Sequence, residues 1–503
     1  MTYQHLKSGS DVRGVAVGEH ATLTLDVART LGTAFAQFIA KKEGKEPSQV
    51  SIALGRDSRV SGPELLRAAG TGIAISDGEA VDYGLCTTPA MFVATKTEGF
   101  MPDGAIMITA SHHPWELNGM KFFTREGGMC FTELDELLKL AENLPEHKGV
   151  ATGVIRSVPF LPTYEEHLKR LIIDGINPEV SMPLLGLHVV VDAGNGAGGF
   201  YAGMLESLGA WVEGSQFLEP DGHFPNHVPN PENKDAMASL SAAVMRVHAD
   251  IGVIFDADCD RAAIVDHTGR EINRNRLIAL ISAILLDCAP GSTIVTDSVT
   301  SSGLADFIQE WGGVHYRYKR GYRNVIDEAI RLNEMGLDCP LAIETSGHAA
   351  LRENHFLDDG MYLVTLLLIR AMQMKQQRQN LGDLLSGLKE PIESVEIRLP
   401  LLGESFAHIG KQVIEQVLEY ASERQEWHIA PDNREGVRIS FDLDNGLNNG
   451  WFLLRLSVHD PLMPLNVESD VPGGVQAILR QFYEAIRNAE GIDSSLIKKA
   501  LGE

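Results

Sequence analysis

The stretch that decides the fold is Ala105–Ile108 (AIMI), which runs directly into Thr109–Pro114 (TASHHP). Four apolar residues followed by small and polar residues and a proline are typical of a buried β-strand that ends in a loop. Ser111 would then lie at the carboxyl end of a strand, where open α/β sheets place their chemistry. A single Ser-His pair in a loop is more often a turn residue with a solvated imidazole than a nucleophile, so the functional interpretation depends on the rest of the chain.

The same kind of structure recurs along the chain. Three units each read as strand, small-residue loop, helix and returning strand, which predicts parallel crossovers and sheets covered by helices. In the first unit these parts are 50–54, 55–62, a helical stretch and 80–84. In the second unit they are 187–191, 192–199, 200–208 and 210–212. In the third unit they are 293–295, 296–303, 304–311 and 314–316.

Each unit is followed by one more apolar strand and a loop rich in reactive side chains. These strand and loop pairs are 105–108 with 109–114, 251–255 with 256–261, and 341–343 with 344–348, and a C-terminal pair is 451–454 with 455–461. We therefore predict four domains that each deliver one loop to a shared cleft. The predicted boundaries are 1–160, 161–268, 269–390 and 391–503.

The loop after 251–255 carries Asp256, Asp258 and Asp260 at alternate positions, a spacing that can turn carboxylates toward one divalent cation. An EF-hand is excluded, because Arg261 and His267 stand where that loop needs Gly and Glu. A haloacid-dehalogenase-like phosphatase, with Asp256 as nucleophile, matches incompletely, because Asp260 stands where that family has Thr or Val. A solvated acidic turn is disfavoured by the apolar strand that precedes the loop.

A literal G-x-G-x-x-G pattern occurs at Gly194, Gly196 and Gly199, with Glu213 about where a ribose-binding acid would stand. This predicts either a dinucleotide site or a tight turn between strand and helix. The other two units make the corresponding turn with Ser and Thr, so the structural interpretation is favoured.

Composition sets the remaining bounds. The chain has 503 residues, of which 44% are hydrophobic and 22% charged, and its net charge of −25 disfavours nucleic acid and anionic membranes as partners. No apolar run approaches the roughly eighteen residues of a membrane helix. The N-terminal residues contain no apolar signal segment, and five cysteines without a C-x-x-C motif argue against a disulfide framework. We expect a cytoplasmic location.

Together these loops resemble, in order, the signature loops of the α-D-phosphohexomutases. The resemblance rests on Thr109–Pro114 with Asn118-Gly119 and Lys121, on 256–261, on 344–348, and on Ser10–Gly14 as an N-terminal Arg-Gly signature. It implies an α/β fold of four domains around a central cleft, the first three topologically similar and the fourth a smaller α+β domain. The implied activity is intramolecular phosphotransfer between the 1- and 6-positions of a hexose phosphate, of the phosphomannomutase/phosphoglucomutase type, through a phosphoserine and a bisphosphate intermediate.

The resemblance also implies site residues. The catalytic residues would be Ser111, as the phosphorylated serine, with His112, Lys121, Arg13, Arg261 and His348. The metal ligands for Mg²⁺ would be Asp256, Asp258, Asp260 and the phosphorylated Ser111. The substrate-binding residues would be Glu344, Ser346, Gly321, Tyr322, Arg323, Arg455 and Ser457. A sugar 1,6-bisphosphate would serve as activator, a sugar phosphate as the small-molecule partner, and the protein would be a monomer or homodimer.

Three positions depart from the family pattern. His113 replaces the usual Asn, 319–323 (KRGYR) replaces the usual third-domain specificity loop, and 458–460 (VHD) replaces a small residue, Thr and an acid or Thr. We predict that His459 supplies the phosphate donor that the missing Thr would give; the alternative is that Arg455 acts with Arg320 or Arg323. Phosphoglucosamine mutase remains a close alternative, and a phosphatase using Asp256 and a dinucleotide-binding oxidoreductase remain more distant ones.

Overall fold

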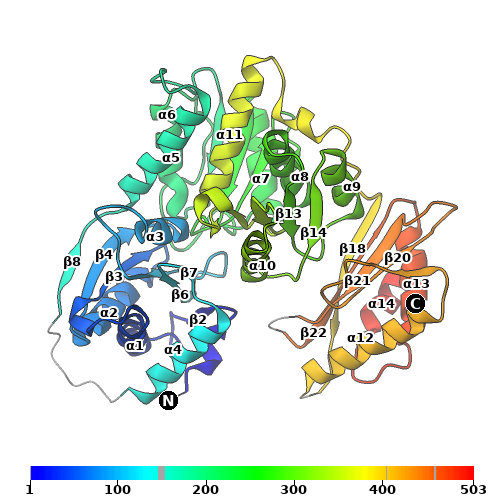
Figure 1. Cartoon of the computed structure of the whole chain (residues 1–503), viewed down its shortest axis with the longest axis horizontal. Coiled ribbons are helices and arrows are strands. Elements are labelled where there is room, and N and C mark those ends of the chain that lie inside the picture. Colours follow the sequence, from blue (N-terminus) through cyan, green and yellow to red (C-terminus); the bar gives the residue numbers. More distant parts are fainter. Residues whose placement is uncertain (1, 145–152, 404, 458–459, 503) are drawn as a thin grey trace. The chain divides into compact units, whose positions relative to one another are not determined.

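The computed structural model describes residues 2–144, 153–403, 405–457 and 460–502. The chain forms two compact units, one made of Met1–Leu277 with Ser346–Leu384 and the other of Ile278–Thr345 with Leu385–Glu503. Many of their helices and strands are labelled in Figure 1. Mixed α/β sheets run through both units, which confirms the predicted fold class.

The first unit contains a sheet with the strand order β1-β2-β6-β5-β3-β4-β8, and β7 pairs with β6. The central strands β3, β4 and β5 are parallel, as predicted, while β6 is antiparallel to β5. The strands are β1 (Lys7–Ser8), β2 (Asp11–Val15), β3 (Ser51–Arg56), β4 (Glu79–Leu85), β5 (Gly104–Ile108), β6 (Leu117–Thr124), β7 (Gly127–Gly128) and β8 (Ile155–Ser157). The helices are α1 (Leu25–Glu43), α2 (Gly62–Ile75), α3 (Thr88–Ala94), α4 (Phe131–Asn143) and α5 (Leu161–Ile176).

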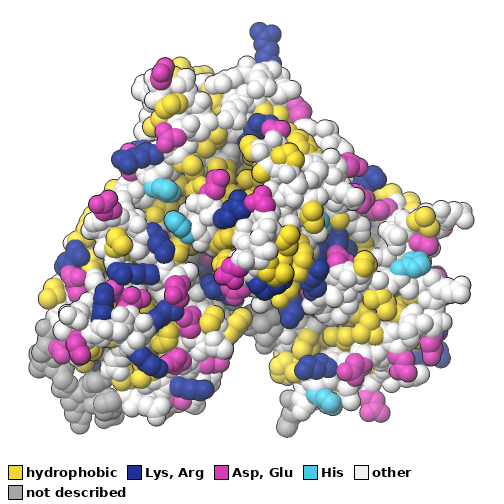
Figure 2. Space-filling model, viewed as in Figure 1, with side chains coloured by type: hydrophobic (Ala, Val, Ile, Leu, Met, Phe, Trp, Pro, Cys, Tyr) yellow, Lys and Arg dark blue, Asp and Glu magenta, His cyan; other side chains and the backbone are white. Residues whose placement is uncertain are grey.

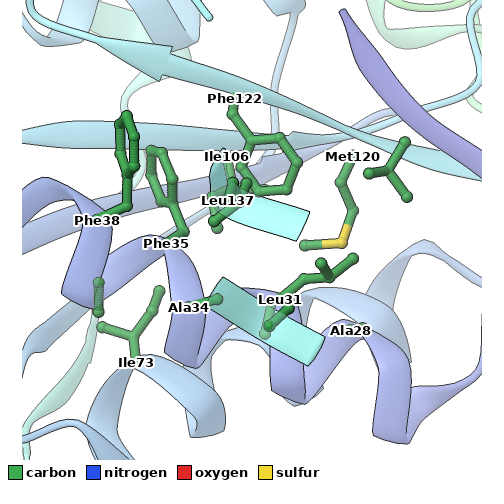
Figure 3. Packing of buried hydrophobic residues seen from close by; sticks show 14 of the residues in the cluster. Ala28, Leu31, Ala34, Phe35, Phe38, Ile73, Ile106, Met120, Phe122 and Leu137 are labelled. Carbon is green, nitrogen blue, oxygen red and sulfur yellow. The ribbon is translucent and has the colours of Figure 1, made fainter. Parts of the chain in front are cut away.

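One face of this sheet is covered by α1, α2 and α4. Figure 3 shows side chains of α1 packed against those of β5 and β6, with Phe35 and Phe122 at the centre. The rings of these two phenylalanines are 5.1 Å apart and both are almost fully buried. Helix α1 begins where the Thr24 side chain accepts the Val27 amide, and it ends at Gly44, whose φ of 64° suits a left-handed cap. This core fixes β5, which leads into the turn of Ser111, and β6, which carries Lys121.

A second sheet of the first unit has the order β12-β11-β10-β9, with β9 and β10 parallel. Its elements are β9 (Val189–Asp192), α6 (Phe200–Ser207), α7 (Lys234–Val247), β10 (Ile251–Phe255), β11 (Ala262–Asp266) and β12 (Glu271–Ile272). The strand predicted over 210–212 is wrong, because in that stretch only Trp211 pairs, through an isolated parallel bridge to His188. Gly209 and Gly214 have φ values of 94° and 89°, so the backbone is turned out of an extended path on both sides.

Four further elements lie in the first unit or lead out of it. They are α8 (Asn275–Cys288), which runs into the second unit, β16 (Ala349–Leu351), β17 (Leu357–Asp358) and α11 (Gly360–Gln376). Helix α11 is capped by Asp359, which accepts the amide of Tyr362 and the hydroxyl of Tyr164 at 2.8 Å. This contact ties α11 to α5 within the unit.

The glycines of the G-x-G-x-x-G pattern are explained by close backbone packing. A Cβ on Gly196 would lie 2.7 Å from the carbonyl oxygen of Ala257, and one on Gly199 would lie 1.9 Å from that of Leu218. The 192–199 loop therefore needs small residues, because the backbone at Ala257 and at Leu218 packs directly against it. This supports the tight-turn interpretation over the dinucleotide site.

We expect Gly199→Ala to lower the free energy of unfolding by about 2 kcal/mol, because the added methyl group collides with rigid backbone. Gly203→Ala on α6 is the matched control: a Cβ there meets nothing within 4 Å, so the change should be neutral or stabilising. Thermal unfolding of both variants measures the difference. Equal stability of the two would remove the packing explanation, as would a rise in melting temperature of the parent protein with NAD or NADP.

The second unit contains two sheets. In one, β13 pairs in parallel with β14 and with β15, as predicted. The other is antiparallel, with the order β18-β22-β21-β20-β19, and its core is rich in aromatic rings such as Trp427, Phe452 and Phe482. The elements are β13 (Thr293–Thr296), α9 (Ser302–Glu310), β14 (Val314–Arg317), α10 (Tyr322–Glu334), β15 (Leu341–Ile343), β18 (Glu393–Pro400), α12 (Phe406–Ser422), β19 (Trp427–Ile429), β20 (Val437–Phe441), β21 (Gly450–Leu454), β22 (Leu462–Ser469), α13 (Gly474–Ile486) and α14 (Ser495–Leu501).

The surface is charged with both signs. In the face seen in Figure 2, acidic and basic side chains are interspersed rather than gathered into one basic patch. Across the described ranges, no helix combines the length and the apolar character needed to span a bilayer.

Candidate active site

Ser111 lies directly after β5 in a strained turn. Its φ is 51°, a left-handed value that is uncommon for a residue with a side chain, and the residue is only 3% exposed. Its Oγ donates to Asp256 Oδ2 at 2.7 Å and accepts from Arg261 Nη2 at 3.0 Å. The Nδ1 of His112 is 3.2 Å from the same oxygen. The serine loop and the acidic loop, predicted from separate stretches, are thus brought together inside one unit.

The three aspartates form one buried cluster. One carboxylate oxygen of each of Asp256, Asp258 and Asp260 lies within 4.8 Å of the others. Burial and the two neighbouring carboxylates raise the pKa of Asp256 well above its usual value. Asp258 Oδ1 and Asp260 Oδ1 are buried with no hydrogen-bond partner in the part of the chain that the structure describes. Converging oxygens with unmet bonding capacity suit a hard cation, so this cluster could hold a metal ion.

Basic side chains surround this cluster. Lys121 on β6 donates to Asp258 Oδ2 at 2.8 Å and also to Asp260. Although burial opposes its charge, these carboxylates raise the pKa of Lys121 well above the usual value, so it stays protonated. Arg13 on β2 pairs with Asp11 at 3.2 Å, and its buried Nε has no partner among the described residues.

A close approach of strands sets the position of Lys121. Strand β2 pairs with β6 so that Arg13 lies opposite Gly119, two residues before Lys121. A Cβ on Gly119 would lie 2.5 Å from the carbonyl oxygen of Val12 and 2.6 Å from that of Thr109. This explains why a glycine follows Asn118 in the predicted motif.

Both histidines of the site are neutral at physiological pH. Burial, then Arg261, lowers the pKa of His112, whose Nδ1 accepts from the Arg261 guanidinium. Burial, then Arg261 and Lys121, lowers the pKa of His348 well below its usual value. The Nδ1 of His348 is 2.9 Å from Ser346 Oγ, and its Nε2 is 3.8 Å from Asp260. A neutral imidazole at this position can accept a proton.

The predicted sugar-binding residues of the second unit include Glu344, which follows β15. Its Oε1 accepts the amide of Gly321 at 2.6 Å. Burial, then Asp297, raises the pKa of Glu344 to about 7. Tyr322 begins α10, and Arg323 on its first turn pairs with Asp327 at 2.8 Å. Ser346, the remaining residue of this group, belongs to the first unit, beside His348.

The predicted phosphate-binding residues follow β21. Arg455 is 7% exposed; burial lowers its pKa, while Glu435 raises it. Its Nε has no hydrogen-bond partner in the described ranges, so a donor there is available to an anion. Ser457 Oγ accepts the amide of Asp460 at 3.2 Å. Val458 and His459 lie outside the described residues.

Several residues of both sites carry no prediction from the sequence. In the first unit, Thr88 donates through its hydroxyl to Asp258 at 2.5 Å. In the second unit, Asp297 and Glu435 interact electrostatically with both Glu344 and Arg455, and so does Arg320, which was predicted only as an alternative partner of Arg455. Asp297 lies in the predicted loop after β13, and this position at the end of a strand could have indicated a role in the site. Glu435 precedes β20, and nothing in the sequence near it indicates a role.

Comparisons with known proteins agree with this arrangement. Three family descriptions match: phosphoglucomutase/phosphomannomutase alpha/beta/alpha domain I over residues 5–146, domain II over 163–269 and domain III over 273–391. A phosphoglucomutase of Neisseria gonorrhoeae is 30% identical over 482 residues, 95% of this chain and 96% of its own. A phosphomannomutase/phosphoglucomutase of Pseudomonas putida is 31% identical over 485 residues, 95% of each chain.

Solved structures with a similar fold were also found. A phosphoglucomutase/phosphomannomutase family protein of Burkholderia thailandensis superposes with a TM-score of 0.79 at 27% identity, covering 97% of this chain and 98% of its own. A parafusin (phosphoglucomutase) of Paramecium, 16% identical, shares the fold with a TM-score of 0.73 over 99% of this chain and 95% of its own. The chain therefore belongs to the phosphoglucomutase/phosphomannomutase family and is a phosphohexomutase, an isomerase of carbohydrate metabolism.

Proposed function

We propose that the enzyme moves a phosphoryl group between O1 and O6 of a hexose phosphate by way of a phosphate carried on Ser111. The observation that supports this most is the environment of Ser111 Oγ, which contacts the carboxylate of Asp256 and the guanidinium of Arg261. An oxygen between a ligand-type carboxylate and a fixed cation suits a phosphoryl group that needs its charge neutralised.

The chemistry is balanced in two transfers. The free hydroxyl oxygen of a sugar monophosphate bonds to the phosphorus on Ser111, the bond from phosphorus to Oγ breaks, and a sugar bisphosphate results. The hydroxyl proton passes to a base, for which neutral His348 is the candidate, and the departing Oγ takes up a proton from protonated Lys121. The bisphosphate then returns its other phosphoryl group to Ser111, which leaves the isomeric monophosphate. In the return transfer the Ser111 hydroxyl gives up its proton and the departing sugar oxygen takes one up through the same two groups. A sugar 1,6-bisphosphate would also phosphorylate an empty Ser111, and this makes it an activator.

Charge neutralisation is divided between a cation and side chains. Asp256, Asp258 and Asp260, with the phosphate on Ser111, would hold Mg²⁺, which when bound supplies positive charge to the transferring group. Arg261 and Lys121 add fixed positive charge, Arg13 extends it at β2, and His112 supports the serine loop. Phosphate monoesters react so slowly in water that neutralisation of this kind has to supply much of the acceleration.

Sugar and distal phosphate would be bound by the other predicted residues. Glu344 and Ser346 would accept hydrogen bonds from sugar hydroxyls, and 321–323 would set the preference among sugars. Arg455, whose Nε has no hydrogen-bond partner among the described residues, would bind the phosphate that is not reacting, together with Ser457 and His459.

The test is an assay with Mg²⁺ and a trace of the matching bisphosphate against glucose, mannose and glucosamine 1-phosphates. We expect conversion of glucose or mannose 1-phosphate to the 6-phosphate without net release of inorganic phosphate. Preference for glucosamine 1-phosphate would make the chain a phosphoglucosamine mutase. Stoichiometric release of inorganic phosphate would identify a phosphatase and refute the proposal.

The role of Glu344 predicts a pH dependence. Its pKa of about 7 means that the carboxylate forms as pH rises through neutrality, and an ionised acceptor binds hydroxyls more strongly. KM for the sugar phosphate should therefore fall as pH rises from 6 to 8, about tenfold at most. Glu344→Gln should raise KM and flatten this profile, while Glu334→Gln, an exposed change on α10, should leave it intact. An unaltered profile in Glu344→Gln would exclude Glu344 as the sugar's acceptor.

A further inference from the structure

A fully buried arginine lies under the serine loop. Arg59 follows β3 and its side chain is 0% exposed. Its Nη2 donates to the carbonyl oxygens of Ser111 at 2.5 Å and His113 at 2.7 Å, and its Nη1 donates to those of Pro114 at 2.8 Å and Leu117 at 2.9 Å. One planar group thus binds four carbonyls, three in the serine loop and one at the first residue of β6, and one of them belongs to the residue we assign as phosphate carrier.

Asp57 completes this arrangement on the amide side of Ser111. It is fully buried, and it accepts from the Arg59 backbone amide at 2.9 Å and from Arg59 Nε at 3.2 Å. It also accepts from Thr109 Oγ1 at 2.7 Å, and that hydroxyl in turn accepts the Ser111 amide at 2.9 Å. Both the amide and the carbonyl of Ser111 are therefore held, directly or through Thr109, by the pair Asp57 and Arg59.

This double hold acts on a residue in an unfavourable conformation. Ser111 has a φ of 51°, and such a backbone persists only where its surroundings determine it fully. An extended loop would turn Oγ away from Asp256 Oδ2, which it now contacts at 2.7 Å.

The pair is also sealed from outside. The ring of Phe224 lies 5.1 Å from the Arg59 guanidinium carbon. The backbone at Gly222 packs so closely that an added Cβ would lie 2.3 Å from the carbonyl oxygen of Ser58. Hydrogen bonds without competing water are stronger and more rigid, so the arginine holds the loop tightly.

We propose that Arg59, with Asp57 and Thr109, is a positioning device that fixes Ser111 Oγ between the metal-binding aspartates and Arg261 for phosphoryl transfer. This inference rests on the proposed function of Ser111. Arg59 reaches only backbone oxygens of the loop, so it acts through Ser111 and is a positioning residue. A bidentate fork is required, because a lysine ammonium is a single point and cannot span four carbonyls.

The first variant is Arg59→Lys. Loss of the fork lets the serine loop relax, and a misplacement of about 1 Å at a reacting atom costs roughly a hundredfold in rate. We expect kcat to fall about a hundredfold while KM for the sugar phosphate changes less than about threefold, because Glu344 and Arg455 are untouched. Arg67→Lys, an exposed arginine on α2, is the matched control and should keep wild-type values.

A second pair of variants separates positioning from folding. Thr109→Val keeps the shape of the side chain but breaks the link from Asp57 to the Ser111 amide, whereas Thr109→Ser keeps the hydroxyl. We expect Thr109→Val to lower kcat at least about tenfold and Thr109→Ser to restore most of it. This pair also decides the matter if Arg59→Lys does not fold.

The phosphorus resonance of phosphoserine provides a readout independent of turnover. In Arg59→Lys and Thr109→Val it should shift or broaden relative to the parent protein, and in Arg67→Lys and Thr109→Ser it should not. Folded variants with normal kcat and an unchanged resonance would overturn the inference, as would equal losses in Thr109→Ser and Thr109→Val. A parent protein without mutase activity would instead refute the proposed function, so the two failures are distinguishable.

Discussion

The Ser111→Ala variant is expected to lose more than about a thousandfold of mutase turnover, because it removes the one oxygen that can carry the phosphoryl group. The same substitution leaves Asp256 and Arg261 facing an apolar methyl group, with their mutual contact at 3.2 Å intact. The fold should therefore survive. Steady-state assay with Mg²⁺ and a trace of bisphosphate measures the loss.

A matched control for this change is Ser207→Ala, an exposed serine at the end of α6. It should keep full activity and the same mass distribution as the parent. The intact-mass spectrum of the Ser111→Ala protein should contain no phosphorylated form. Substantial turnover in a folded Ser111→Ala protein would rule out a phosphoserine route.

Asp258→Asn is expected to lower turnover about a thousandfold, because it removes one negative ligand from a cluster built for a dication. Asp258 has one oxygen bound by Lys121 and Thr88, while the other is buried without a partner among the described residues. An amide in its place keeps the size of the side chain and removes the charge, so affinity for Mg²⁺ or Mn²⁺ should fall about tenfold or more.

Stability distinguishes a metal role from a structural role for Asp258. Three clustered carboxylates repel one another without metal, so in the presence of a chelator Asp258→Asn should unfold at a temperature no lower than the parent does. Titration calorimetry with Mn²⁺ and thermal unfolding check both points. Asp174→Asn, an exposed change of the same charge, serves as control. Near-normal turnover of Asp258→Asn at saturating Mg²⁺ would show the metal assignment to be wrong.

The sequence predicts the strands that carry the site, for a physical reason. Runs such as 105–108, 251–255 and 341–343 are apolar on both faces, as buried parallel strands must be, and their ends locate Ser111, Asp256 and Glu344. The strand predicted over 210–212 does not form, because little in the surrounding structure stabilises it. Trp211 is 68% exposed, and glycines with positive φ flank the segment, so no core holds it in an extended conformation.

Arg59 shows a different limit. Its partners are backbone carbonyls between 52 and 58 residues further along the chain. Every residue has a backbone carbonyl, so the residue types do not show which carbonyls an arginine binds. The same holds for Glu435, which reaches Ser298 from a separate sheet. Contacts of this kind become visible only when the fold brings distant loops together. The role of His459 and the four domain boundaries remain predictions.

The measurement that tests the central claim most directly is the location of phosphate in the purified protein. We expect peptide mapping to place an acid-stable phosphate on Ser111, and the phosphorylated fraction to rise after incubation with a sugar 1,6-bisphosphate. The phosphate should disappear in Ser111→Ala and remain after treatment with hydroxylamine. A phosphate on Asp256, labile to hydroxylamine, would contradict the account and make the chain an aspartyl-phosphate enzyme.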